Sequence, residues 1–264
     1  MPSKTKLTLL TVCLLAEGLA GALTLADNGA TDKPGKNNGS HAMDSHAVLD
    51  ITGEAFRQGS DTLLYRERHR YSTLKDNTHQ QDVIYTQPDG TPWAQKKLHY
   101  DQHPTAPSFT LTDRRNQESL QVTVESEHIS ILHSHNDKQQ TAKVEIQSPL
   151  VVDAGFDPFV RQHWQSLHQG ESETFFFLLP RRERLVELKL SSRPCAEYDP
   201  DLFLCLSLDI NNWFLRMLVD TVELTYQRSD KRLVQYRGVS NLSFPEQDET
   251  PHVDIFYRPT NDDH

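Results

Sequence analysis

The chain has 264 residues and carries 27 Lys and Arg against 37 Asp and Glu, which gives a formal net charge of -10 at pH 7 and a pI of about 5.7. Its basic residues form no cluster interleaved with aromatic side chains, so the composition argues against nucleic-acid binding. An acidic surface of this kind is also repelled by anionic lipid headgroups.

The N-terminus has the three parts of a secretory signal peptide. Lys4 and Lys6 form a short basic region, an apolar run extends from Leu7 to Leu15, and small residues offer a cleavage site after Ala22 or Ala26. We therefore predict a signal peptide over residues 1–22. The predicted localisation is the bacterial periplasm or the secreted fraction.

Two residues bear on the alternatives to a cleaved signal peptide. Glu17 interrupts the apolar stretch, so no continuous run of about 20 apolar residues is available to span a membrane. Cys13 follows a poor match to a bacterial lipobox, which makes lipidation a weak alternative. We expect no stable transmembrane span after cleavage.

The segment over residues 23–47 has no hydrophobic periodicity and is rich in Asn, Gly, Asp, Lys and Ser. Such a composition buries too little apolar surface to offset the entropy of ordering, so we predict a disordered linker. Residues 48–264 show no internal repeat, and their number suits a single β-rich domain better than two domains.

Most of this domain consists of short segments with strand character, separated by turn residues. Val222, Leu224 and Tyr226 alternate with polar residues, which indicates one buried and one solvent-facing side. The segment from Asn211 to Val219 lacks a clear period and suggests a turn or a short 3-10 helix. We predict strands at Leu49–Arg57, Thr62–Ser72, Val83–Thr86, Trp93–Tyr100, Phe109–Thr112, Leu120–Glu125, His128–His133, Lys143–Gln147, Thr174–Leu179, Leu185–Ser191, Leu204–Ile210, Val222–Gln227, Leu233–Val239 and Val253–Tyr257.

One amphipathic helix is predicted among these strands. Asp157 is expected to cap its N-terminus, Pro158 suits the first helical turn, and Gly170 offers a left-handed stop. Between them, residues of the apolar stripe recur at helical spacing: Phe159, Val160, His163, Trp164 and Leu167. The fold class is therefore mainly β, a curved antiparallel sheet or open (half) β-barrel with one amphipathic helix packed on it.

Removal of the signal peptide leaves Cys195 and Cys205 as an even pair in an oxidising compartment. Each lies beside a segment with strand character, so a disulfide between them would staple a loop across the mouth of a hairpin. The rival interpretation, a redox or metal pair, lacks the C-x-x-C spacing. We predict a structural disulfide.

The apolar run from Phe175 to Leu179 has two interpretations. It is either the wall of a ligand groove or a central strand buried on both faces. The residues of the predicted groove are Phe159, Trp164, Phe175, Phe177 and Leu179. The following Arg181–Arg184 segment suggests a solvated turn, with an anion-binding cluster as the alternative.

No catalytic or metal motif is found. His133 and His135 share one face of a strand, but a zinc site needs a third ligand and no H-E-x-x-H signature is present. Ser240 lacks the following glycine of a G-x-S-x-G elbow. Asp153 and Asp157 suggest either an acid/base pair in a cleft or helix capping, and capping is favoured. We predict no catalytic residue, no metal site and no cofactor, with an unrecognised hydrolase as the rival.

Three segments of the chain resemble a known family. They are YTQPDGTPWAQKKLHY at Tyr85–Tyr100, AGFDPFVRQHW at Ala154–Trp164 and LVQYRGVSNL at Leu233–Leu242. The family comprises uncharacterised exported bacterial proteins of the periplasmic half-barrel group, and the resemblance covers most of residues 63–257. The group also includes the lipoprotein carrier LolA, to which the resemblance is one of architecture. It implies an incomplete antiparallel barrel whose concave apolar face holds acyl chains. The chain departs from the carrier in having one clear covering helix.

These observations together predict an exported, non-catalytic envelope protein that binds an apolar or amphipathic ligand. The expected partner is a lipid or the acyl chain of a lipoprotein. The alternative is a protein-interaction or assembly factor of the cell envelope that takes no small-molecule ligand.

Overall fold

The computed structural model describes residues 49–74, 78–101, 103–211, 221–240, 242, 244 and 250–260. Eight strands precede the helical segment: β1 (Leu49–Arg57), β2 (Leu63–Thr73), β3 (His79–Thr86), β4 (Pro92–Tyr100), β5 (Ser108–Asp113), β6 (Glu118–Val124), β7 (His128–His135) and β8 (Lys138–Glu145). The short strand β9 (Leu150–Val151) then leads into the 3-10 turn η1 (Asp153–Gly155) and the helices α1 (Phe156–Gln162) and α2 (Trp164–His168). The remaining elements are β10 (Ser172–Leu179), η2 (Pro180–Arg182), β11 (Arg184–Arg193), β12 (Phe203–Ile210), β13 (Val222–Gln227), β14 (Arg232–Val239) and β15 (His252–Pro259).

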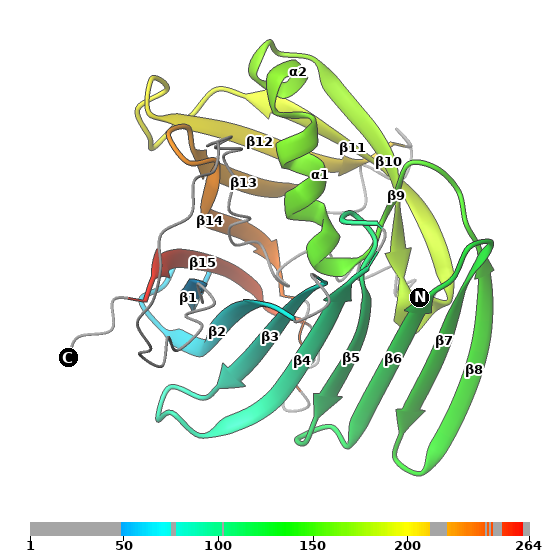
Figure 1. Cartoon of the computed structure of the whole chain (residues 1–264). Coiled ribbons are helices and arrows are strands. Elements are labelled where there is room, and N and C mark those ends of the chain that lie inside the picture. Colours follow the sequence, from blue (N-terminus) through cyan, green and yellow to red (C-terminus); the bar gives the residue numbers. More distant parts are fainter. Residues whose placement is uncertain are drawn as a thin grey trace, which may run out of the picture.

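All of these strands belong to one sheet, in the order β8-β7-β6-β5-β4-β3-β2-β1-β15-β14-β13-β12-β11-β10-β9. Every neighbouring pair is antiparallel except β9 and β10, which run parallel. β1 pairs with β2 on one side and with β15 on the other, so it joins the two halves of the chain. The sheet is open, with β8 and β9 at its edges. It curls around the helices, which lie inside the curve (Figure 1).

The curl follows from the strands themselves. Long antiparallel strands twist, and β-bulges increase that twist locally. Register shifts occur at Ala55/Phe56 in β1, at Tyr85/Thr86 in β3 and at Thr225/Tyr226 in β13. The inner face of the curve, which we call the concave face, therefore receives every second side chain of each strand.

Most side chains of the concave face are apolar and form one core together with the helices. Phe109 and Leu111 on β5, for example, alternate with exposed threonines. Near the two edges of the sheet, side chains connect strands that do not pair. Arg181, just after β10, donates from Nε and from a terminal guanidinium nitrogen to the Glu118 carboxylate on β6, at 2.7 and 2.9 Å. This ion pair links the two ends of the curl.

The strand pattern and the fold class predicted from the sequence are confirmed. All fourteen predicted segments are strands, although the bounds of β3, β6, β7, β8, β10, β11 and β15 differ from the prediction by two to five residues. The two-residue strand β9 was not predicted. The predicted signal peptide and linker, over residues 1–47, lie outside the described residues. The predicted turn at Asn211–Val219 also lies outside them except for Asn211.

Candidate functional site

The helical segment consists of two short helices rather than one. α1 and α2 are separated at His163, whose φ and ψ of -98° and 16° are not helical. The predicted left-handed glycine at the end of the helical segment is confirmed, because Gly170 has a φ of 87° shortly after α2 ends. Phe156, Phe159, Val160 and Leu167 are buried, so the segment packs its apolar stripe against the concave face.

The predicted cap at Asp157 is wrong. α1 begins at Phe156, after Gly155, and no side chain caps it. Asp157 lies within the first turn, where its carboxylate accepts a hydrogen bond of 2.6 Å from Arg161 Nε. Both side chains are nearly buried, and burial raises the pKa of Asp157 despite the opposing effect of Arg161. The residue therefore takes part in a buried ion pair instead of closing the helix end.

The N-terminal end of the segment is held by the loop before β5. The backbone N–H of Val152 donates to the carbonyl of Thr105 at 2.9 Å, and Thr105 Oγ1 donates to the carbonyl of Leu150 at 2.9 Å. Gly155 is required at this contact, because a Cβ there would lie 1.9 Å from the carbonyl oxygen of Thr105. The segment is thus fixed to the first half of the sheet through a close backbone approach.

The C-terminal end of the segment is held by the second half of the sheet. Ser192 Oγ on β11 donates to the carbonyl of Leu167, and Arg228 contacts the ring of His168. Arg161 also donates to the carbonyl of Asp230 at 3.2 Å. The helices therefore bridge the two halves of the curled sheet.

Of the five predicted groove residues, Phe159 on α1 and Phe175 on β10 meet where the helix packs on the sheet. The ring centroid of Phe159 lies 4.6 Å from that of Phe175, and both side chains are fully buried. Phe177 and Leu179 are only 4% and 5% exposed and share the Phe175 face of β10 by strand alternation. Trp164 differs, because it is only partly buried and lies edge-on to Tyr226 at 6.0 Å.

Sequence reasoning missed a group of buried polar side chains on β2, β3 and β4. Glu67, His69, Gln81 and Lys96 all have no exposed surface and all belong to the concave face. The available signal was the alternation in β2, where three arginines take one face and Tyr65, Glu67 and His69 the other. Because both faces carry polar residues, the segment reads as a solvent-exposed strand.

A hydrogen-bond network orients part of this group. Gln81 Nε2 donates to Tyr71 Oη at 2.7 Å and lies 3.1 Å from His69 Nδ1. Its Oε1 accepts a hydrogen bond of 2.8 Å from Tyr100 Oη. His69 Nε2 in turn lies 3.2 Å from Glu67 Oε1. The network therefore leads across three strands to the Glu67 carboxylate.

Lys96 forms a second buried contact with the helical segment. Its Nζ donates to Asp153 Oδ2 at 2.8 Å, so η1 is tied to β4. Burial lowers the Lys96 pKa to about 8, and Asp153 opposes that shift. Burying a charged lysine costs free energy, because its ammonium group loses its hydration. Such a residue is therefore unexpected in a core that serves stability alone.

Arg181 belongs to the RRER segment that suggested a solvated turn. Its side chain instead binds Glu118, and His133 Nε2 lies 2.8 Å from the same carboxylate. For Glu118, burial acts to raise the pKa, but the hydrogen bonds and charges of Arg181 and His133 prevail and lower it. The segment forms a turn that is exposed at Arg182–Arg184, as predicted, and Arg181 departs from the prediction because its side chain binds a carboxylate of this chain.

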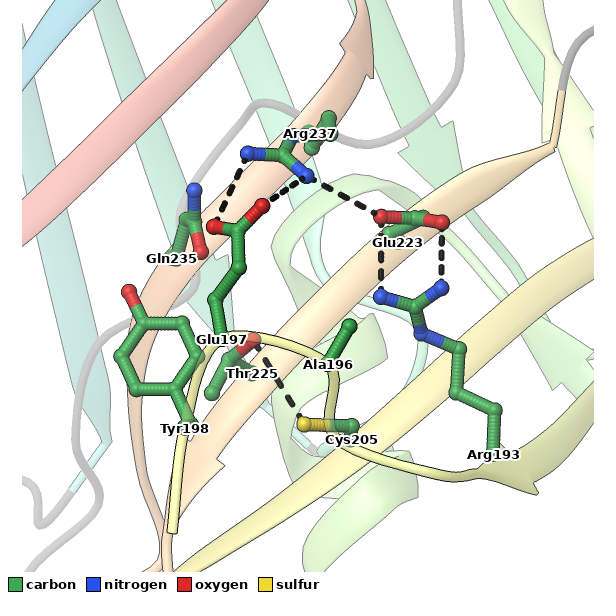
Figure 2. A pocket seen from close by; sticks show the side chains of 9 residues that line it. All are labelled: Arg193, Ala196, Glu197, Tyr198, Cys205, Glu223, Thr225, Gln235 and Arg237. Atoms are coloured by element: carbon green, nitrogen blue, oxygen red, sulfur yellow. Dashed lines mark hydrogen bonds and ion pairs between the residues drawn. The ribbon is translucent and has the colours of Figure 1, made fainter.

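The predicted disulfide is confirmed, since Cys195 and Cys205 are bonded with Cα atoms 5.3 Å apart. It pins a loop over the outer face of β13 and β14, beside a small polar pocket (Figure 2). In this pocket Arg237 binds Glu197 at 3.2 and 3.3 Å and Glu223 at 3.6 Å, and Glu223 also binds Arg193. The charges satisfy one another, so this pocket stabilises the loop.

The histidine and aspartate pairs considered in the sequence do not form a catalytic or metal site among the described residues. The rings of His133 and His135 stack with centroids 6.5 Å apart. Within the described residues, no group of three or more His, Cys, Asp or Glu side chains is arranged to hold a metal ion. Asp153 binds Lys96 and Asp157 binds Arg161, so the two carboxylates have separate partners. No helix in the described part of the chain has the length and apolar character needed to cross a membrane.

Comparison with known proteins identifies the fold but not a family. No protein-family model matches the chain, and no curated protein matches it. The crystal structure of a β-barrel-like protein of domain of unknown function DUF1849 from Brucella abortus is similar, with a TM-score of 0.50 and 8% identity. The match covers 81% of this chain and 97% of that chain. It supports a β-barrel-like fold and does not single out the lipoprotein-carrier group.

Proposed function

We propose that the protein is an exported, non-catalytic binding protein that holds an amphipathic ligand on its concave face, beneath α1 and α2. The ligand class is a lipid or the acyl chain of a lipoprotein. The resemblance of three segments to the LolA-like group supports this proposal, as does the β-barrel-like fold of the structural neighbour.

One observation carries the proposal: the concave face is divided chemically. The region formed by β10 to β13 is apolar, with Phe175, Leu190 and Leu206 fully buried. The region formed by β2 to β4 also buries ionisable groups, among them Glu67 and Lys96. Buried charges are rarely favourable in a core that serves stability alone, and they concentrate at functional sites. An amphipathic ligand matches both regions.

Access to this face requires the helical segment to move. Phe159 and Phe175 are buried against each other, so an acyl chain reaches the apolar region only when α1 lifts from β10. Besides this apolar packing, hydrogen bonds hold the segment at its two ends, through Thr105 on one side and Ser192 on the other. We propose that the C-terminal attachment opens, because the close packing of Gly155 on Thr105 fixes the N-terminal end.

Binding of a neutral probe tests the proposal. The fluorescent probe N-phenyl-1-naphthylamine is titrated into the purified protein and then displaced with dodecanol. Phe177→Trp adds volume on the buried face of β10 at a cost of about 1–3 kcal/mol of stability, so the fold survives while probe affinity is expected to fall at least tenfold. Phe176→Trp is the matched control, because Phe176 lies on the opposite face of β10 and is only partly buried.

Two results would count against the proposal. If wild-type protein binds neither the probe nor dodecanol, the concave face is a closed core, and the assembly-factor role takes its place. If Phe176→Trp weakens binding as much as Phe177→Trp does, the probe occupies the outer face of the sheet.

A further inference from the structure

Gly53 on β1 creates room for a polar group at the centre of the sheet. It pairs with Glu67 on β2 and with Tyr257 on β15, so the three residues point to the same face. A Cβ at Gly53 would lie 2.8 Å from Glu67 Cγ and 2.8 Å from Tyr257 Cε1. The glycine therefore lets the Glu67 and Tyr257 side chains meet above the strand between them.

Three oxygen-bearing groups at this place have unmet hydrogen-bonding capacity. Both carboxylate oxygens of Glu67 and the hydroxyls of Tyr85 and Tyr257 are fully buried, and none forms a well-aligned hydrogen bond with any described residue. Their nearest contacts are with one another and with His69: the Tyr257 hydroxyl interacts with the Glu67 carboxylate, and His69 Nε2 lies 3.2 Å from Glu67 Oε1. Buried polar groups in folded proteins are almost always hydrogen-bonded. A cluster of exceptions at one point therefore indicates that a further group belongs there.

The charge at this point is negative. His69 Nε2 lies 3.2 Å from Glu67 Oε1, and His69 Nδ1 lies 3.1 Å from Gln81 Nε2. Within the described parts of the chain, no Lys or Arg nitrogen lies within 4.0 Å of Glu67. Burial, and then the charge of Glu67, raises the pKa of Tyr85 and of Tyr257 well above their ordinary value. Both tyrosines are therefore neutral phenols whose oxygens can accept hydrogen bonds.

We infer that Glu67, Tyr85 and Tyr257 form a recognition site for a primary ammonium group, so that the ligand of the concave face is an amine-bearing amphiphile. An ammonium offers three N–H donors and no acceptor, which matches one carboxylate and two phenol oxygens. It balances the charge of Glu67, and aromatic side chains around it stabilise a cation further. A carboxylate or phosphate placed here is repelled. This inference rests on the proposed function for the position of the alkyl chain.

The site lies next to the N-terminal end of the helical segment. Tyr85 pairs with Ala94 on β4, and Lys96, two residues further on the same face of β4, binds Asp153 of η1 at 2.8 Å. Lys96 is already paired with Asp153 and does not compete for Glu67. A ligand whose chain lies under α1 therefore extends its head group toward β2 and β15.

Competition among three ligands of equal chain length tests the inference. Dodecylammonium, dodecanol and dodecanoate each displace the neutral probe, and dodecylammonium is expected to bind at least tenfold more tightly than dodecanol. Glu67→Gln keeps the shape but removes the charge, so it reduces affinity for dodecylammonium about 10- to 100-fold and leaves that for dodecanol unchanged. Tyr257→Phe removes one acceptor and gives a smaller loss.

Glu54→Gln is the matched control. It makes the same substitution on β1, but Glu54 lies on the outer face of the sheet, where it binds Arg66 at 3.1 Å. Equal affinity for all three ligands, or an ammonium preference that survives Glu67→Gln, would overturn the inference and leave the proposed function standing. Butylammonium chloride, followed by NMR, separates the two ideas. If it binds through Glu67 while no dodecyl compound binds, the inference stands and the proposed function fails; if neither binds, both fail.

Discussion

Replacing Phe159 by alanine tests whether α1 is docked on the sheet. Phe159 is 1% exposed, and its ring centroid lies 4.6 Å from that of Phe175 and 4.4 Å from that of His163. The substitution removes a fully buried aromatic ring from a contact between helix and strand. We expect it to lower the free energy of unfolding by about 3–5 kcal/mol, the range for Phe→Ala in packed cores.

Equilibrium urea unfolding, followed by circular dichroism, measures this loss as a lower midpoint at unchanged slope. Trp164→Ala is the comparison, because Trp164 is only partly buried and should cost less than Phe159→Ala. A Phe159→Ala midpoint equal to that of the wild type would refute the docked position of α1. The bridge between the two halves of the sheet would then have no energetic basis.

Three further predictions follow from individual contacts. Cys195 and Cys205 should resist alkylation without reductant in an intact-mass measurement, and replacing both by alanine should cost about 2–3 kcal/mol in urea unfolding. Gly53→Ala should lower stability by about 1–3 kcal/mol, because the new Cβ meets Glu67 and Tyr257 at 2.8 Å, whereas an unchanged melting temperature would contradict that packing. The pKa of Lys96 is about 8 in the folded protein and 10.5 ordinarily, so between these pH values the unfolded chain binds a proton that the folded protein does not. The free energy of unfolding therefore rises with pH in this window, by about 2–3 kcal/mol from pH 8 to pH 10 when the pH dependence of Lys96→Met is subtracted. Parallel curves for the two proteins would contradict the burial of a charged lysine.

The strands were predictable because each carries its own signal. Runs such as Val222–Gln227 alternate strictly, and this alternation is a local property that does not depend on the neighbouring strand. The curled shape and the disulfide were predictable in the same way, from the number of strands and from two cysteines beside strand-like segments. The two-residue strand β9 was not, since it is too short to show any period.

The buried polar groups could not be predicted from local pattern. Lys96 and Glu67 look like solvent-facing residues in the sequence, and only the approach of η1, β3 and β15 places them in the interior. Asp157 was misassigned for a related reason. A carboxylate near a helix start commonly caps it, but here Arg161, one turn later, takes the carboxylate. Long-range packing decides these positions.

Isothermal titration calorimetry with dodecylammonium at several temperatures tests the central claim most directly. If the alkyl chain enters the concave face beneath α1, binding should show a negative heat-capacity change of roughly -0.2 kcal/mol/K, the value for removing a twelve-carbon alkyl chain from water. Phe177→Trp should abolish that change. A wild-type protein that gives no binding heat at any temperature, or binding with no heat-capacity change, would contradict an amphiphile-binding role for this face.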